Sequence, residues 1–225
     1  VGRGAELAGL SAGMSAATGI AHTRWATHGV PCERNAHPHI SGGLAVVHNG
    51  IIENFEELRR ELEGLGYTFT SDTDTETIAH LIQEQRKSAP DLFTAVRLAA
   101  QRLQGAYAIA VLQESDSQTL IVAREGSPLL LGLGEDGNYA ASDASALLQV
   151  TRRMVYLENG DIARLTPDSV TITRLDGTPV HRPETLSQLS ADAVELGTFQ
   201  HYMQKEIFEQ PDALANTLEM VGAAK

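Results

Sequence analysis

The sequence predicts an α+β fold in which antiparallel sheets are layered with helices. The second half of the chain holds a series of short apolar runs separated by turns of a few residues, and such short turns favour antiparallel pairing. Only a few segments place apolar residues at helical spacing. Because 42% of the 225 residues are hydrophobic, the chain can bury a sizeable core as one large domain or two small ones.

Charge and cysteine content narrow the classes of partner. A formal net charge of -12 argues against a nucleic-acid or anionic-membrane surface, since neither would attract such a field. Small molecules or proteins are the expected partners. Cys32 is the single cysteine, which rules out an internal disulfide, and the sequence shows no long apolar run and no signal-like N-terminus. We therefore expect a cytoplasmic location.

The first predicted element is a short buried strand that begins around Gly19 and runs into a loop, with Gly29-Val30-Pro31 at its exit. Period-two alternation puts His22 and Arg24 on one face and the only tryptophan, Trp25, on the other. A guanidinium fork suits a carboxylate or phosphate, and a broad indole ring can cover a small ligand. The pair predicts an anion-binding pocket, with the alternative that Arg24 closes an ion pair with a nearby carboxylate while Trp25 packs in the core.

A second polar strand end follows. Residues 35–39 are predicted to be an irregular loop, and residues 44–48 a strand that ends at Asn49-Gly50. Such a pair often forms a hairpin turn, but Asn54 then reads as the N-cap of a helix with apolar residues at helical spacing. Asn49 and Gly50 would thus offer an amide side chain and an unobstructed backbone N–H near a loop, two donors of the kind an oxyanion hole needs.

Two further helices are predicted. Residues 71–76 are predicted to form the N-terminus of a helix that ends around Lys87. The two aspartates of this N-terminus, Asp72 and Asp74, either cap the helix or bind a ligand ammonium or a divalent metal. The next helix begins at Pro90-Asp91 and stops at Gly105. Its apolar stripe indicates a purely structural role.

The rest of the first domain is predicted to be strands, with a short helix around residues 145–149. The strands cover residues 106–112, 119–123, 129–133, 138–141, 154–157, 161–165 and 170–175. The domain is expected to close near Pro179, followed by a polar connector over residues 183–197 and a helical stretch from His201 that Pro211 restarts. This divides the chain into residues 1–180 and 181–225.

Taken together, five motifs resemble a known family. They are His-Thr-Arg-Trp-Ala-Thr-His-Gly at 22–29, Asn-Ala-His-Pro-His at 35–39, His-Asn-Gly-Ile-Ile-Glu-Asn at 48–54, Ser-Asp-Thr-Asp-Thr-Glu at 71–76 and His-Tyr-Met-Gln-Lys-Glu-Ile at 201–207. In composition and order they resemble the glutaminase (type 2, class II glutamine amidotransferase) domains of the isomerizing glutamine-fructose-6-phosphate aminotransferase family. The tryptophan after Arg24, the 71–76 run and the tail favour this family over amidophosphoribosyltransferases and asparagine synthetases.

The resemblance implies a fold and a reaction. The fold would be a four-layer αββα sandwich of the N-terminal-nucleophile hydrolases, with antiparallel sheets. The domain would hydrolyse L-glutamine to glutamate and ammonia without a cofactor. The ammonia would pass to a sugar-isomerase domain, of which residues 181–225 would be the start and which binds fructose 6-phosphate to make glucosamine 6-phosphate. The full-length enzyme would be a homodimer.

The resemblance also implies residue roles. Arg24 would hold the α-carboxylate of glutamine and Asp74 its α-ammonium, roles that their charges permit. Asn49 and Gly50 would form the oxyanion hole. The other implied positions line the glutamine pocket or gate the passage of ammonia: Thr27 and His28 for the pocket, and Trp25 for the gate.

One residue of the family pattern falls outside these 225 residues. The resemblance implies an N-terminal cysteine whose thiolate attacks the amide while its own amine serves as base, whereas residue 1 here is Val1. Cys32 has no free amine and lies outside every matching motif, so it reads as an ordinary loop residue. A polypeptide that begins at Val1 is therefore expected to bind glutamine without hydrolysing it.

Two other classes of function are compatible with the residue pattern. The first is a metal-dependent hydrolase, because histidines crowd one region and Asp72 or Asp74 could complete a site. Its candidate histidine ligands are His22, His28, His37, His39 and His48. The second is a non-catalytic glutamine-binding or regulatory domain.

Overall fold

The computed structural model describes residues 16–24, 27–188 and 197–223. The chain divides into two compact units, the first extending to Ser187 and the second beginning at Gln188. The second unit contains one described helix, α5 (Tyr202–Ala223). None of the helices in the described part of the chain combines the length and apolar character needed to cross a membrane.

The main sheet of the first unit has six strands in the order β1-β2-β3-β4-β8-β9. Its strands are β1 (His39–Ser41), β2 (Leu44–Ile52), β3 (Gly105–Gln113), β4 (Asp116–Glu125), β8 (Asp161–Leu165) and β9 (Val170–Arg174). All neighbours pair antiparallel, as the short connections predict. The pairing of β2 with β3 covers the whole of β2, from Leu44 opposite Gln113 to Ile52 opposite Gly105. The ladder therefore fixes both ends of the strand that carries Asn49.

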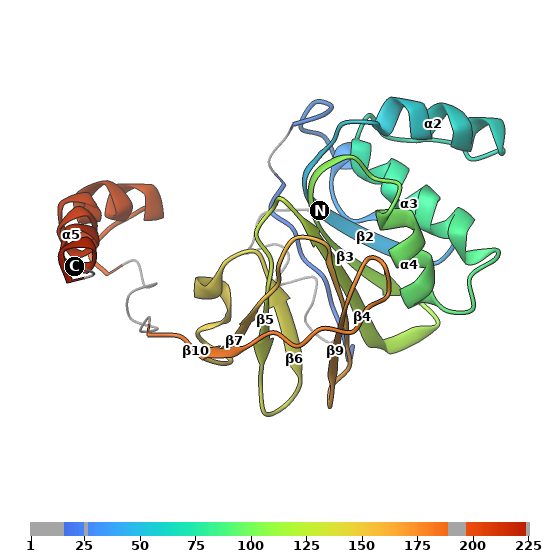
Figure 1. The fold of residues 1–225 in the computed structure, drawn as a ribbon. Coiled ribbons are helices and arrows are strands. Elements are labelled where there is room, and N and C mark those ends of the chain that lie inside the picture. Colours follow the sequence, from blue (N-terminus) through green and yellow to red (C-terminus); the bar gives the residue numbers. More distant parts are fainter. Residues whose placement is uncertain (1–15, 25–26, 189–196, 224–225) are drawn as a thin grey trace. The chain divides into compact units, whose positions relative to one another are not determined.

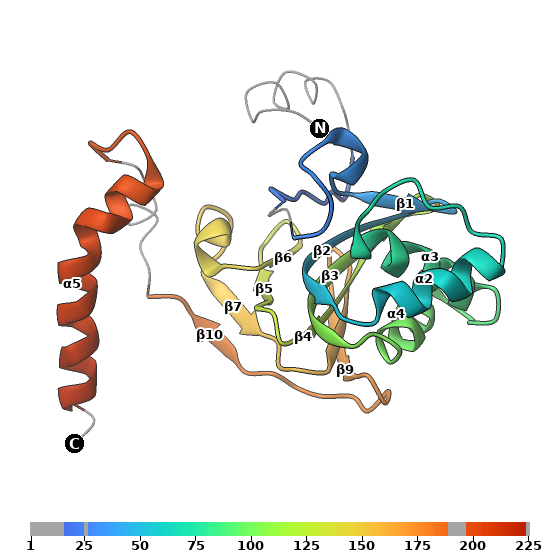
Figure 2. The ribbon, with the colours of Figure 1, turned by 90° about the horizontal axis from the view of Figure 1, so that it is seen from above.

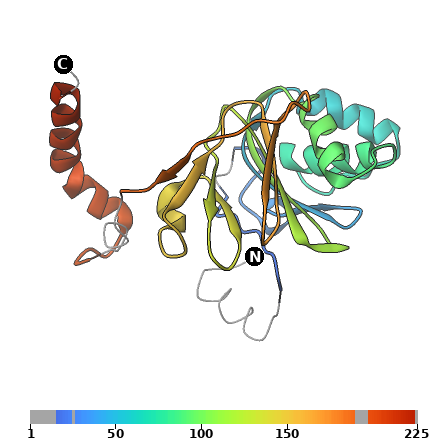
Figure 3. The ribbon, with the colours of Figure 1, turned by 60° about the horizontal axis from the view of Figure 1, so that its bottom comes forward.

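A second antiparallel sheet has four strands in the order β10-β7-β5-β6. They are β5 (Leu130–Leu133), β6 (Asn138–Ala141), β7 (Arg153–Tyr156) and β10 (Glu184–Leu186). The two sheets face each other in the first unit (Figures 1 and 3). The core between them combines apolar residues of both sheets, such as Val122 and Ala163 from one and Leu131 and Val155 from the other.

Three helices cover the other face of the six-stranded sheet (Figure 2). They are α2 (Phe55–Gly64), α3 (Asp74–Arg86) and α4 (Leu92–Ala100), and short 3-10 turns occur at η1 (Glu33–Asn35) and η2 (Ala144–Leu147). Helix α4 begins after Asp91 as predicted, and the Asp91 carboxylate accepts from the N–H of Thr94. The cap of α3 differs from the aspartates considered from the sequence, because the Thr73 hydroxyl accepts from the N–H of Glu76. The larger core lies between these helices and the sheet.

The predicted α+β class with layered antiparallel sheets is confirmed by this arrangement. In the described part of the first unit, α-helices lie on one side of the paired sheets only (Figure 1). The second helical layer of the αββα sandwich is therefore not among the described elements.

Several predicted elements differ in detail. Residues 16–24 form no strand, although their partial burial alternates with period two from Thr18 to Arg24 as expected. The strand expected to end at residue 48 continues to Ile52 because β3 pairs with it throughout, so Asn49 and Gly50 lie within β2 and not in a loop. Asn54 occupies the N-cap position, but its side chain bonds the carbonyl of Arg102 and the N–H of Gln104.

Two further expectations for the polar segments were wrong. The loop around residues 35–39 contains η1 and runs into β1, and the predicted connector contains β10, which pairs with β7. Helix α5 does not restart at Pro211 but runs through it. Proline removes one hydrogen bond and can bend a helix without ending it.

Candidate active site

The backbone carbonyls of residues 28–30 surround the guanidinium of Arg24. The backbone of Arg24 lies in the left-handed region at φ 42°, which is uncommon for a residue other than glycine. Its Nη2 donates to the carbonyls of His28 and Gly29 at 2.9 and 3.0 Å, and its Nη1 donates to the carbonyl of Val30 at 3.2 Å. These carbonyls account for three of the five guanidinium N–H donors.

Arg24 pairs with no carboxylate within ion-pair distance in the described part of the chain. The alternative of a structural ion pair at this residue is therefore wrong. The positive charge is held by neutral carbonyls, and the remaining guanidinium donors can meet an anion from outside the chain.

Asn35 fixes the loop that supplies those carbonyls. Its fully buried side chain donates to the carbonyl of Val30 at 3.1 Å and to Asp72 Oδ2 at 3.1 Å, and accepts from the N–H of Asp72 at 2.9 Å. Gly29 adopts φ 72°, and a Cβ there would approach Asn35 Nδ2 to 2.5 Å. The loop therefore packs closely against the segment that leads into α3.

Asp74 is the first residue of α3 and is 3% exposed. Its Oδ2 accepts from the N–H of Ile52 at 2.9 Å. His28 Nδ1 lies 3.9 Å from its Oδ1, and His48 Nδ1 lies 3.9 Å from its Oδ2. A carboxylate at a helix N-terminus is stabilised by the helix dipole, which offsets part of the cost of burial.

Neutral histidines line the inner wall of the site. The Thr75 hydroxyl lies 3.1 Å from both His48 Nδ1 and His37 Nε2, so it bridges the two rings. Burial, together with a smaller contribution from the nearby His22, lowers the pKa of His37 to about 3. Burial also lowers the pKa of His48 to about 4, although Asp74 opposes this shift. Both rings are therefore uncharged at neutral pH, and the charges facing the site come from Arg24 and Asp74.

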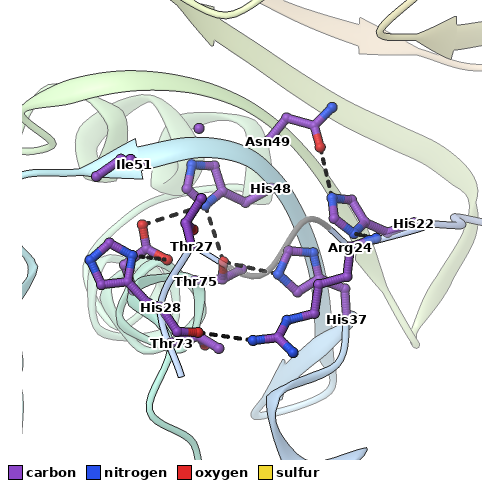
Figure 4. A pocket seen from close by; sticks show the side chains of 12 residues that line it. His22, Arg24, Thr27, His28, His37, His48, Asn49, Ile51, Thr73 and Thr75 are labelled. Atoms are coloured by element: carbon purple, nitrogen blue, oxygen red, sulfur yellow. Dashed lines mark hydrogen bonds and ion pairs between the residues drawn. The ribbon is translucent and has the colours of Figure 1, made fainter. Parts of the chain in front are cut away.

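Asn49 and Gly50 lie next to these histidines on β2. The ladder places Asn49 opposite Ala108 and Gly50 opposite Tyr107 on β3. His22 Nε2 lies 2.7 Å from Asn49 Oδ1, and the N–H of Arg24 lies 2.8 Å from His22 Nδ1 (Figure 4). The amide of Asn49 is thus connected to the backbone of Arg24 through one imidazole.

These side chains enclose a cavity of about 310 Å³, within the range of small-molecule sites. Figure 4 shows how its walls come from His22, Arg24, Thr27 and His28, from β2 and from the start of α3. Of the residues singled out from the sequence, the following line it: Arg24, Thr27, His28, Asn49, Gly50 and Asp74. A second cavity of about 510 Å³ shares His22, His48 and Asn49 with the first. Asn49 therefore lies where the two cavities meet.

The remaining candidates lie elsewhere. Trp25, expected to gate ammonia, lies outside the described residues. Cys32 is an exposed free cysteine and does not line the cavity. Within the ranges that the structure describes, no three His, Cys, Asp or Glu side chains converge to hold a metal ion, so the metal-hydrolase alternative has no geometric support.

Sequence reasoning assigned no role to Thr75 or Asn35. Thr75 belongs to the 71–76 run, but nothing local indicates that its hydroxyl reaches two histidines from other segments. Asn35 begins the 35–39 motif, and its contacts with residues 37 positions away depend on the fold. The motifs themselves were the only signal that could have pointed to these residues.

Comparisons with known proteins agree with this geometry. The sequence model of the family described as a glutamine amidotransferase domain matches residues 22–149. A glutamine-fructose-6-phosphate aminotransferase (isomerizing) of Acidithiobacillus ferridurans is 59% identical over 222 residues, which cover 97% of this chain and 36% of that protein. The protein of the same name in Vibrio cholerae is 54% identical over 209 residues, which cover 93% of this chain and 34% of that protein. The chain spans about a third of the length of these curated relatives.

A solved structure is similar as well. The glutamine phosphoribosylpyrophosphate amidotransferase of B. subtilis, complexed with ADP and GMP, matches with a TM-score of 0.58 at 29% identity. The match covers 68% of this chain and 34% of that chain.

Proposed function

The chain belongs to the glutamine amidotransferase domain family, and from this premise we propose that its 310 Å³ cavity binds L-glutamine for hydrolysis to glutamate and ammonia. The observation that carries the proposal is the presence of Arg24 and Asp74 on the walls of one cavity. A free amino acid carries a carboxylate and an ammonium on the same carbon. A guanidinium with unused donors and a buried carboxylate complement these two groups.

The reacting end of glutamine would lie against β2. Hydrolysis of an amide places negative charge on the carbonyl oxygen in the tetrahedral intermediate, and preorganised N–H donors stabilise that charge. The Asn49 side chain and the Gly50 backbone are the proposed donors, and Thr27 and His28 complete the wall around the substrate. The attacking thiolate is the N-terminal cysteine that the family resemblance implies. It is not one of these 225 residues.

The relatives suggest the wider reaction. The names of the two curated relatives describe an isomerizing aminotransferase that uses glutamine and fructose 6-phosphate. In a longer polypeptide of this kind, residues 1–180 would be the glutaminase domain and residues 181–225 the connector to a sugar-isomerase domain. The ammonia would then be used for glucosamine 6-phosphate synthesis, with Trp25 as its gate. A homodimer in the cytoplasm is part of the same proposal.

The test measures glutamate and ammonia release from L-glutamine by the natural polypeptide that contains this chain. We expect turnover that is unchanged by Cys32→Ser, because Cys32 is exposed and lies away from the cavity. We also expect turnover to survive dialysis against a chelator. Loss of turnover on chelation would favour the metal-dependent hydrolase, and glutamine binding without any turnover would favour a regulatory domain.

A further inference from the structure

The imidazole of His22 makes two hydrogen bonds that join the two ends of the candidate site. On one side its Nδ1 lies 2.8 Å from the backbone N of Arg24, and on the other its Nε2 lies 2.7 Å from Asn49 Oδ1 (Figure 4). The ring also packs on His37, with 4.0 Å between the ring centroids. These contacts hold the ring of His22 in one orientation.

The chemistry of the two partners selects one tautomer. A backbone N–H can only donate, so Nδ1 must carry the lone pair that accepts from Arg24. In a neutral imidazole the proton then sits on Nε2, which makes Nε2 the donor to Asn49. A donor at this position requires an acceptor, so the atom of Asn49 that faces His22 must be its oxygen. The amide nitrogen of Asn49 is left as the outward end of the side chain.

This orientation is the one that oxyanion stabilisation requires. Rotating the Asn49 amide by half a turn would replace the NH₂ donor by an oxygen that repels a developing negative charge. In the part of the chain that the structure describes, His22 is the only side chain that bonds Asn49, and Asn49 itself is exposed. The direction of this amide therefore depends on the tautomer of His22.

We propose that His22 is a positioning residue that couples the substrate anchor Arg24 to the oxyanion donor Asn49, an inference that rests on the proposed glutaminase function. Its Nδ1 holds the N–H of Arg24, whose backbone lies in the left-handed region at φ 42°. Its Nε2–H holds the amide of Asn49. His22 touches neither the substrate nor the reacting bond in this proposal, and its effect passes through its two partners.

Two substitutions separate the two bonds. The amide oxygen of an asparagine at position 22 occupies the place of Nδ1, so His22→Asn keeps the acceptor for Arg24 and loses the donor to Asn49. The amide nitrogen of a glutamine occupies the place of Nε2, so His22→Gln keeps the donor and loses the acceptor. His22→Leu removes both bonds. Thermal melting of each variant establishes that it is folded before its kinetics are compared.

The kinetic test uses glutamine hydrolysis by the natural polypeptide that contains this chain. His22→Asn is expected to lower kcat by about 10- to 100-fold with little change in KM, because misplacing a catalytic group by about 1 Å can cost 100-fold. His22→Gln is expected to restore most of kcat while raising KM for glutamine. Equal losses in both variants, or an effect on KM alone in His22→Asn, would overturn the proposal.

A double-mutant cycle tests the route of the effect. If His22 acts on kcat through Asn49, then His22→Asn should cost little more in an Asn49→Ala background, in which the oriented amide is already absent. Asn49→Ala alone should lower kcat by about 100- to 1,000-fold, as for other oxyanion donors. Full multiplication of the two losses would show that His22 acts independently of Asn49, contrary to the proposal.

A spectroscopic readout does not depend on activity. Long-range ¹H–¹⁵N correlation on protein labelled at histidine distinguishes the two neutral tautomers, and we expect His22 to carry its proton on Nε2. A proton on Nδ1 would refute the proposal whatever the enzyme does. If the protein showed no glutaminase activity while His22 carried the Nε2 proton, the proposed function would fail but the bond network would stand.

Discussion

The carboxylate of Asp74 accepts a hydrogen bond from the backbone N–H of Ile52, with Oδ2 and N separated by 2.9 Å. This bond ties the first residue of α3 to the last residue of β2, the strand that carries Asn49 and Gly50. The proposed ammonium site and the proposed oxyanion site are therefore fixed to each other by backbone geometry. Asp74 can keep this structural bond with one oxygen while its charge serves the substrate.

Replacing Asp74 by Asn should separate these two roles. The asparagine oxygen can still accept from Ile52, so the free energy of unfolding should change little. The negative charge is lost, however, and a hydrogen bond to a charged group contributes about 1.5–3 kcal/mol, so glutamine affinity should fall roughly 10- to 100-fold. Isothermal titration with glutamine measures the effect. Asp168→Asn is the matched control, because Asp168 is exposed and does not line the cavity.

Replacing Arg24 by Lys should weaken glutamine binding even though the charge is conserved. Three guanidinium donors hold the carbonyls of residues 28–30, and the rest are available to a carboxylate. An ammonium offers three donors from one point and cannot serve both sets in the same geometry. We expect KM for glutamine to rise about tenfold or more. The control is Arg34→Lys, because Arg34 pairs with Asp72 and neither residue lines the cavity. An equal rise in KM for both variants would contradict the assignment of Arg24.

The helices show how much of the fold local chemistry determines. The Pro90-Asp91 start signal and the spacing of apolar residues indicated α3 and α4, because such signals lie in or next to the helix itself. Strands β1 and β10 were missed, since each has three residues and exists through pairing with a neighbour. The strand predicted from residue 19 has an alternating burial pattern, but within the described residues it has no partner with which to form a ladder.

In the candidate site, too, some features could be predicted from the sequence and others could not. Arg24, Asn49 and Asp74 were identified because motifs preserve residue types in order along the chain. The support for these residues was not predictable, because it comes from segments far away in the sequence. Asn35 contacts Asp72 across 37 positions, and the N–H of Ile52 reaches Asp74 across 22. Only the folded backbone brings such pairs together.

Acid should destabilise the fold through the buried histidines. Burial lowers the pKa of His37 to about 3 and of His48 to about 4, from 6.5 when unfolded. Between those values and pH 6.5 the unfolded chain binds more protons than the folded one, so the free energy of unfolding falls as the pH drops below about 6.5. Burial opposes ionisation of Glu76, but the nearby His80 ring and hydrogen bonds from Ser71 lower its pKa. The stability that this lowered pKa provides is present above pH 4.5 and is lost at lower pH, so it acts in the same direction.

Urea titrations at a series of pH values from 7.5 to 4.5 measure this effect. The wild-type free energy of unfolding should decrease steadily over this range. In His37→Gln the amide nitrogen can still reach the Thr75 hydroxyl, but one titrating group is gone. The free energy of unfolding should therefore change less steeply with pH around pH 5.5, by about 1.4 kcal/mol per pH unit, because one proton fewer is bound on unfolding. An unchanged slope in this variant would show that His37 is not held neutral by the fold.

Gly50 is expected to tolerate no side chain. Its backbone adopts φ 129°, and a Cβ there would overlap the carbonyl oxygen of Ala106 on the neighbouring strand. Gly50→Ala must therefore shift β2 away from β3 or strain the backbone, and we expect a loss of more than about 3 kcal/mol in the free energy of unfolding. Gly64→Ala is the matched control, since no atom lies within 4 Å of a Cβ added at this last residue of α2. Alanine there should stabilise the protein by about 0.5–1 kcal/mol. Urea midpoints that moved by the same amount in both variants would mean that the close approach of β2 and β3 at Gly50 does not restrict this position.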